Sequence, residues 1–185
     1  MATDTALHYT VPGLEEGAAQ KIIDLLQSRL HAANDLQLTL KHVHWNVVGP
    51  HFIAVHEMID PQVDAVRAMA DTLAERIATL GGAPRGTPGA LVKERAWDDY
   101  SIGRATTQEH LAALDITYRG VITSYREAIK ALDDLDLVTQ DVLIGQVEQL
   151  ELFHWFVRAH LEDQGGKLQT EGATTEAGAA RDASG

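Results

Sequence analysis

Metal-ligating side chains recur through residues 40–82 at spacings that suggest chemistry. Two are histidines and three are carboxylates: His44, His56, Asp60, Asp71 and Glu75. Imidazole nitrogen and carboxylate oxygen form a ligand set that suits iron, manganese or zinc. We therefore predict that these residues form a metal-binding active site.

The spacing excludes a site made by one helix alone. His56 and Asp60 are four residues apart, as are Asp71 and Glu75, so each pair spans about one helical turn. Eleven residues separate Asp60 from Asp71, which is roughly 17 Å along a straight helix. His44 precedes a turn and can fold back toward His56. A closed site therefore requires two copies of this helix pair about a two-fold axis, which creates two sites per dimer.

The acidic stripe on this helix has an alternative interpretation as an ordinary solvated face. Exposed helix faces usually mix charges of both signs. Here only Arg67 balances the carboxylates, and small or apolar residues border the stripe on its far side. We therefore expect this face to be covered, with Asp64 paired to Arg67.

Apolar residues at helical spacing predict the elements that position these side chains. Two helices are expected over residues 17–47 and 52–80, with a turn at Gly49 and Pro50 between them. Two more are expected from near Arg104 to Leu132 and from about Val138 to Glu162; Thr106 and Glu109 have capping-box spacing at the start of the third helix. The intervening residues 83–103 exceed usual loop lengths, so they should carry a short helix.

The fold class that follows is all-α, a four-helix bundle with a short extra helix in the crossover between helices 2 and 3. We expect a flexible arm over residues 1–16, the bundle over 17–166, and a flexible, aperiodic tail over 167–185. The chain contains no cysteine, and neither a signal peptide nor a membrane span is recognisable, so a cytoplasmic location is expected. The net charge of −12 attracts cations and repels polyanions.

The motif that carries the metal ligands resembles that of the Dps proteins, the miniferritins of the ferritin-like superfamily. The stretches HVHWNVVGPHFIAVHEMID and ADTLAERIATLGG carry the resemblance, which extends over roughly residues 15–165. It implies a ferritin-like bundle assembled from two-fold dimers into a dodecamer with tetrahedral symmetry. It also implies that His44, His56 and Asp60 come from one subunit and Asp71 and Glu75 from its two-fold mate.

The resemblance further implies a ferroxidase. Fe(II) would be oxidised, preferentially with hydrogen peroxide, at an intersubunit di-iron site, where Mn or Zn could substitute. The Fe(III) mineral would be stored inside the shell and oxidative damage avoided. Trp45 would lie beside the site and absorb oxidising equivalents, besides its packing role. Asp136 and Asp141 are the candidates for a cation pore at the three-fold axes.

DNA binding is doubtful from the charges at both ends of the chain. The arm has no Lys or Arg before Lys21. The tail carries two basic residues, Lys167 and Arg181, against three acidic ones. Phosphate neutralisation supplies most non-specific affinity for DNA, and neither end offers it.

Another activity is compatible with the same metal ligands. A bound metal lowers the pKa of its water, so a hydrolase of N-acyl or peptide bonds is the alternative function. Glu151 and His154 form one i,i+3 pair of the kind found in larger ferritins, but no second pair exists in the sequence. We therefore interpret His154 as a core histidine and predict no metal inside the bundle.

Overall fold

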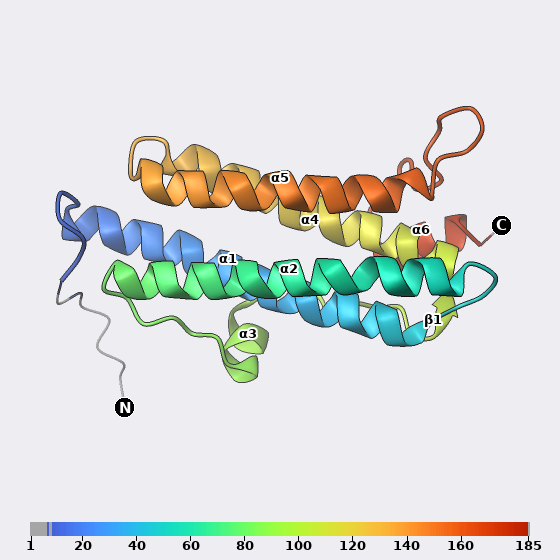
Figure 1. Cartoon of the computed structure of the whole chain (residues 1–185), viewed down its shortest axis with the longest axis horizontal. Helices are drawn as coiled ribbons and strands as arrows, with labels where there is room; N and C mark the ends of the chain where they lie inside the picture. Colours follow the sequence, from blue (N-terminus) through green and yellow to red (C-terminus); the bar gives the residue numbers. More distant parts are fainter. Residues whose placement is uncertain (1–6, 8, 185) are drawn as a thin grey trace.

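The computed structural model describes residue 7 and residues 9–184 of the 185-residue chain. Four long helices lie side by side in this part: α1 (Glu16–Asn46), α2 (Phe52–Thr79), α4 (Thr107–Leu132) and α5 (Leu137–Ala159) (Figure 1). The prediction of an all-α four-helix bundle is confirmed. The expected arm of residues 1–16 lies partly outside the described residues.

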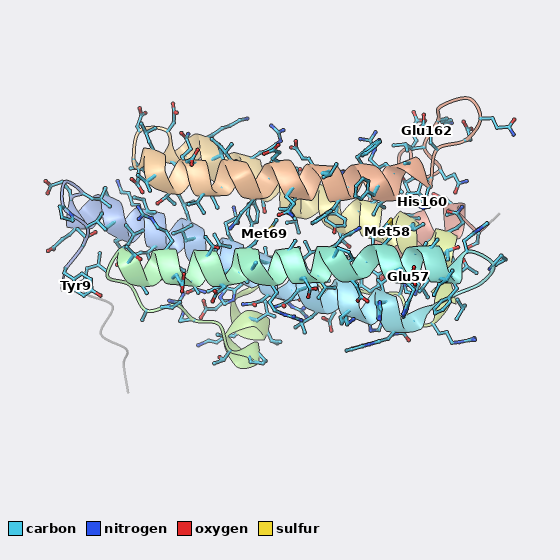
Figure 2. The ribbon with its side chains drawn as sticks, viewed as in Figure 1. Tyr9, Glu57, Met58, Met69, His160 and Glu162 are labelled. Atoms are coloured by element: carbon cyan, nitrogen blue, oxygen red, sulfur yellow. The ribbon has the colours of Figure 1, made fainter. Side chains whose placement is uncertain are left out.

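The bundle is held by one continuous apolar core. Every long helix contributes buried side chains, among them Leu40, Ile59, Leu114 and Leu150. Met58 and Met69 lie on the side of α2 that faces α5, and Met69 is buried in the core (Figure 2). Burial of these apolar side chains is the main favourable term that holds the helices together.

A tight turn joins α1 to α2. Gly49 has a positive φ of 112°, a conformation that glycine adopts without steric cost. Just before it, β1 (Val47–Val48) pairs in parallel with β2 (Ala105–Thr106), so the end of α1 is tied to the start of α4. The turn and the strand pair fix the position of the α1 C-terminus, where His44 lies.

The crossover between α2 and α4 contains the expected short helix, α3 (Pro88–Glu94), which begins with Thr87 as its N-cap. The capping box predicted at the start of α4 is also present. Thr106 accepts a hydrogen bond from the Glu109 backbone N–H, and the Glu109 carboxylate accepts one from the Thr106 N–H. Both caps satisfy backbone donors that lack partners inside their own helix.

The C-terminal segment differs from the expected aperiodic tail. A helix, α6 (Glu176–Asp182), follows the cap Thr175 and packs against α4, with Ala179 and Ala180 buried. The reason is physical: alanines can bury a helix face by close backbone approach without the large apolar residues that reveal periodicity. No helix in the described part is long and apolar enough to cross a membrane.

Candidate metal site at the α1–α2 turn

His44 and His56 face each other across the α1–α2 turn. Their rings stack with centroids 3.6 Å apart and an interplanar angle of 22°. His44 Nδ1 lies 3.0 Å from the His56 carbonyl oxygen, and His56 Nδ1 lies 2.9 Å from the His44 carbonyl oxygen. A carbonyl oxygen only accepts hydrogen bonds, so each Nδ1 carries the proton and donates it. Nε2 is then the ring atom of each histidine that is left for a ligand.

This arrangement is the one that metal-binding histidines use. A backbone carbonyl that holds one ring nitrogen fixes the tautomer and the ring orientation, and leaves the other nitrogen to coordinate. The two histidines can satisfy each other because His44 lies in the last turn of α1 and His56 in the second turn of α2. Their side chains therefore fit a divalent metal by chemistry and by orientation.

Asp60 lies next to this histidine pair, one turn further along α2. Its Oδ1 is 3.2 Å from His44 Nδ1 and 2.6 Å from Lys41 Nζ. The hydrogen bond from Lys41 is the main cause that lowers the pKa of Asp60 below its usual value. The carboxylate is therefore ionised at neutral pH. Our sequence reasoning missed Lys41, although its place one turn before His44 puts it on the same helix face.

Asp71 and Glu75 do not approach the other three predicted ligands. Both lie exposed on α2, beyond Asp60 along the helix. Across residues 9–184, no group of three or more potential ligands is close enough to hold a metal. Trp45, next to His44, is 71% exposed. A complete five-ligand site thus requires a second chain.

The other charges of the α2 face have local partners. Arg67 pairs with Asp64 at 3.4 Å, as predicted.

Leu38 and Ile53, close to the ligand histidines in sequence, are 59% and 58% exposed. Large apolar side chains exposed beside an acidic face are typical of a surface that another protein covers.

The two pore candidates differ in their surroundings. Asp136 is the N-cap of α5, where its carboxylate accepts from the Thr139 N–H at 3.0 Å and pairs with Arg76 at 2.7 Å. Burial opposes the charge of Asp136, but the bonds from Thr139 and Arg76 outweigh it and lower the pKa. Asp141 is exposed on the first turns of α5. Asp136 thus already has a structural role.

His154 is hydrogen-bonded to a buried carboxylate of the bundle. Its Nε2 lies 2.7 Å from Oδ1 of Asp115, a carboxylate that is only 1% exposed. Asp115 also accepts bonds from Thr170 at 2.8 Å and Arg119 at 2.7 Å. Burial raises the pKa of Asp115, but these donors outweigh it and bring the pKa to about 2. The interpretation of His154 as a satisfied core histidine is confirmed, and the Asp115 cluster was missed.

Residues 23–164 match the ferritin-like domain of the Ferritin family. The chain is 63% identical over 172 residues to the DNA protection during starvation protein of Mycolicibacterium smegmatis, covering 93% of this chain and 94% of that protein. The solved structure of Mycobacterium smegmatis Dps has 62% identity and a TM-score of 0.90, covering 92% of this chain and 98% of that one.

Other Dps structures agree. DpsA14 from Streptomyces coelicolor is 65% identical, with a TM-score of 0.87 over 89% of this chain and 98% of that one. Dps from Microbacterium arborescens, solved in a high iron form, is 31% identical, with a TM-score of 0.73 over 78% of this chain and 94% of that one. The span matched to the Ferritin family, residues 23–164, contains the α1–α2 hairpin.

Proposed function

This chain belongs to the Dps family of ferritin-like proteins, and from that membership we propose that it oxidises Fe(II) and stores the Fe(III) product. The observation that carries the proposal is the reciprocal bonding of His44 and His56, which prepares both Nε2 atoms as ligands. Asp60 adds an ionised oxygen beside them. Iron is the substrate and cargo here, and hydrogen peroxide is the preferred oxidant.

The site is proposed to form between two subunits. One subunit supplies His44, His56 and Asp60, and its two-fold mate supplies Asp71 and Glu75. Support comes from the separation of the two groups on one chain and from the exposed apolar residues that flank them. A two-fold axis creates two equal sites, and six such dimers would complete a twelve-subunit shell.

Two adjacent iron ions would explain the protective value of the reaction. Hydrogen peroxide needs two electrons to become water or hydroxide, and each Fe(II) supplies one. A pair of irons can thus reduce one peroxide completely, whereas a single iron would release a hydroxyl radical. The protein's part is to hold the two ions close together, and Trp45 beside them is placed to take up a stray oxidising equivalent.

Among the acidic residues before and within α5, Asp141 is the stronger candidate for the cation pore. Asp136 binds Arg76 and Thr139, which satisfies its carboxylate. Asp141 is exposed and lies five residues further along. We expect Asp141→Asn to slow Fe(II) uptake more than Asp134→Asn, an exposed control in the turn between α4 and α5. Equal rates in the two variants would exclude Asp141 as a pore residue.

DNA is not among the proposed ligands. The Mycolicibacterium smegmatis relative is named for DNA protection, but both ends of this chain are poor in basic residues. The last seven-residue helix, which holds Arg181, also carries Glu176 and Asp182. We expect no gel shift of duplex DNA at physiological salt, and a clear shift under those conditions would contradict this expectation.

Co-expression of two inactive variants tests the shared site directly. His44→Ala and Asp71→Ala should each slow Fe(II) oxidation by peroxide under anaerobic conditions. Chains of the two kinds, mixed in one shell, rebuild one intact site in every mixed dimer, so roughly a quarter of the sites should recover. His44→Ala mixed with His56→Ala is the matched control, because both ligands come from the same side and no site is rebuilt.

The activities of the two mixtures distinguish a site shared between subunits from a site within one chain. Recovery in the first mixture and none in the control supports a site shared between subunits. No recovery in either mixture would mean that the five residues act within single chains or take no part in the reaction. If the unaltered protein oxidises Fe(II) no faster than buffer, the ferroxidase proposal fails, and turnover of N-acyl or peptide substrates is then the next assay.

A further inference from the structure

A cavity of about 580 Å³ lies between α1 and α4, away from the metal ligands. Its walls are the facing sides of the two helices, the crossover residues 96–101 and the segment 174–177 before and at the start of α6. Its volume is in the range of small-molecule sites. None of the five predicted metal ligands lines it.

The body of the cavity is apolar and is kept open by small residues. Ala32, Leu36, Ile116 and Val121 form its apolar wall. Gly120 also lines it, and a Cβ added there would meet no atom within 4 Å. Glycine inside a helix costs about 1 kcal/mol relative to alanine. Gly120 is exposed at this wall and leaves the space beside it open.

One charged group on the wall, Arg29, has no carboxylate within ion-pair distance, although its guanidinium lies 5.8 Å from the Tyr125 ring centroid and Glu127 acts on it at longer range. Arg29 donates to the Ser124 carbonyl oxygen and to Ser28 Oγ, both neutral acceptors. Its Nε is buried without a partner, and no carboxylate among the described residues is within ion-pair distance of it. A partly buried charge without a partner is costly. The guanidinium thus lines the cavity without an ion pair, and its unpartnered Nε is itself buried.

Most carboxylates on the wall already have donors. Asp35 accepts from Trp97 Nε1 at 2.6 Å and pairs with Arg95 at 3.2 Å. Asp99 also pairs with Arg95, at 2.8 Å. Asp98 is exposed at the surface, where water screens its charge. Glu176, the remaining carboxylate on the wall, accepts only from neutral donors, so Arg29 and Glu176 are the two charges on the wall without an ion pair among the described residues.

The C-terminal segment closes one side of the cavity. The Glu176 carboxylate accepts from the Ser101 backbone N–H at 2.9 Å and from Thr117 Oγ1 at 3.2 Å. These bonds join the start of α6 to the crossover and to α4. The tail thus acts as a wall, so a bound molecule would contact it.

We propose that this cavity binds a small organic acid whose apolar body fills the space between α1 and α4 and whose carboxylate pairs with Arg29. The planar guanidinium, which lacks an ion pair, matches a carboxylate. The apolar wall matches a hydrocarbon or aromatic body. The inference does not depend on the iron chemistry, so it stands or falls separately from the ferroxidase proposal.

Calorimetric titration of the intact protein with decanoate tests the proposal. We expect about one decanoate per chain. Decanol keeps the body without the charge and should bind at least tenfold more weakly, which corresponds to about 1.4 kcal/mol. Decyltrimethylammonium reverses the charge and should not bind. Arg29→Gln should weaken the binding of decanoate at least tenfold. Gly120→Leu, whose side chain would occupy the cavity, should abolish binding.

Matched variants control for general effects. Arg158→Gln removes an exposed charge on α5. Gly145→Leu adds a large side chain at a helical glycine that has free space around it and lies outside the cavity. Both should bind decanoate normally. Hydrogen exchange with decanoate present should slow in residues 96–101 and 174–177.

Several results would overturn the proposal. One is no binding of decanoate to the intact protein. Another is equal affinity in Arg29→Gln, or protection by decanoate confined to other segments. Tighter binding of decyltrimethylammonium than of decanoate would refute the assignment of a carboxylate ligand.

Discussion

Lys41 Nζ lies 2.6 Å from Asp60 Oδ1, so an ammonium group stands within the predicted metal site. The same oxygen is 3.2 Å from His44 Nδ1. A metal ion that binds Asp60 has to displace this ammonium or share the carboxylate with it. Lys41 therefore competes with the metal for one ligand, and it also holds that ligand ionised and in place before the metal arrives.

Replacing Lys41 with methionine should raise the affinity for a divalent cation. We expect a few-fold tighter binding of Mn²⁺, a redox-stable substitute for Fe(II), because ion pairs of half-exposed groups are weak. Calorimetric titration measures this. Lys21→Met, on the exposed face of the same helix, should leave the affinity unchanged. Weaker Mn²⁺ binding in Lys41→Met would mean that the lysine helps to organise the site.

Asp115→Asn should lower the free energy of unfolding and make it depend less on pH in the acidic range. The pKa of Asp115 is lowered from 3.8 to about 2 in the folded protein. The ionised carboxylate therefore stabilises the fold above about pH 4, and this contribution of about 2 kcal/mol is lost as the pH falls toward 2. Denaturant unfolding at several pH values measures it. A variant that loses as much stability between pH 4 and 2 as the unaltered protein would contradict this role.

Arg76 and Asp136 should be energetically coupled across α2 and α5. Asp136→Ala removes both the N-cap of α5 and the partner of Arg76, so we expect a loss of about 2 kcal/mol. A double-mutant cycle with Arg76→Met should give a coupling energy of about 1 kcal/mol. Asp134→Ala, an exposed neighbour, is the control. Additive effects of the two substitutions would show that the pair contributes nothing beyond its separate parts.

Two glycines should respond in opposite directions to alanine. Gly81 has a φ of +90°, and a Cβ there would lie 2.0 Å from the Tyr9 carbonyl oxygen. Gly81→Ala should therefore destabilise the protein by at least about 1 kcal/mol. Gly120→Ala, with nothing within 4 Å, should stabilise it by about 0.5–1 kcal/mol. Thermal unfolding of both variants at one protein concentration checks the signs.

The parts of the fold that could be predicted from sequence depend on local spacing. The four long helices follow from apolar residues at helical intervals. His44 and His56 are twelve residues apart on either side of a turn marked by Gly49 and Pro50, so their meeting follows from the hairpin. Asp60 is one turn beyond His56. Each inference needs only the geometry of one helix and one turn.

Features that depend on the rotation of one helix against another were not predictable. Asp115 meets His154 and Thr170, which are 39 and 55 residues away, and nothing in the sequence gives the faces that pair. The helix α6 was missed because its buried face is alanine. Asp71 and Glu75 approach no other predicted ligand within the described chain, so a site shared between subunits stays a prediction for the mixing experiment.

The docked helix α6 also limits how far a subunit can extend. Residues 167–184, fully stretched, would span roughly 60 Å. The helix α6 instead folds back on α4 (Figure 1). Arg181 is exposed on this docked helix. While α6 stays docked, this segment cannot reach a second particle, so we expect assemblies of this protein to stay dispersed in solution.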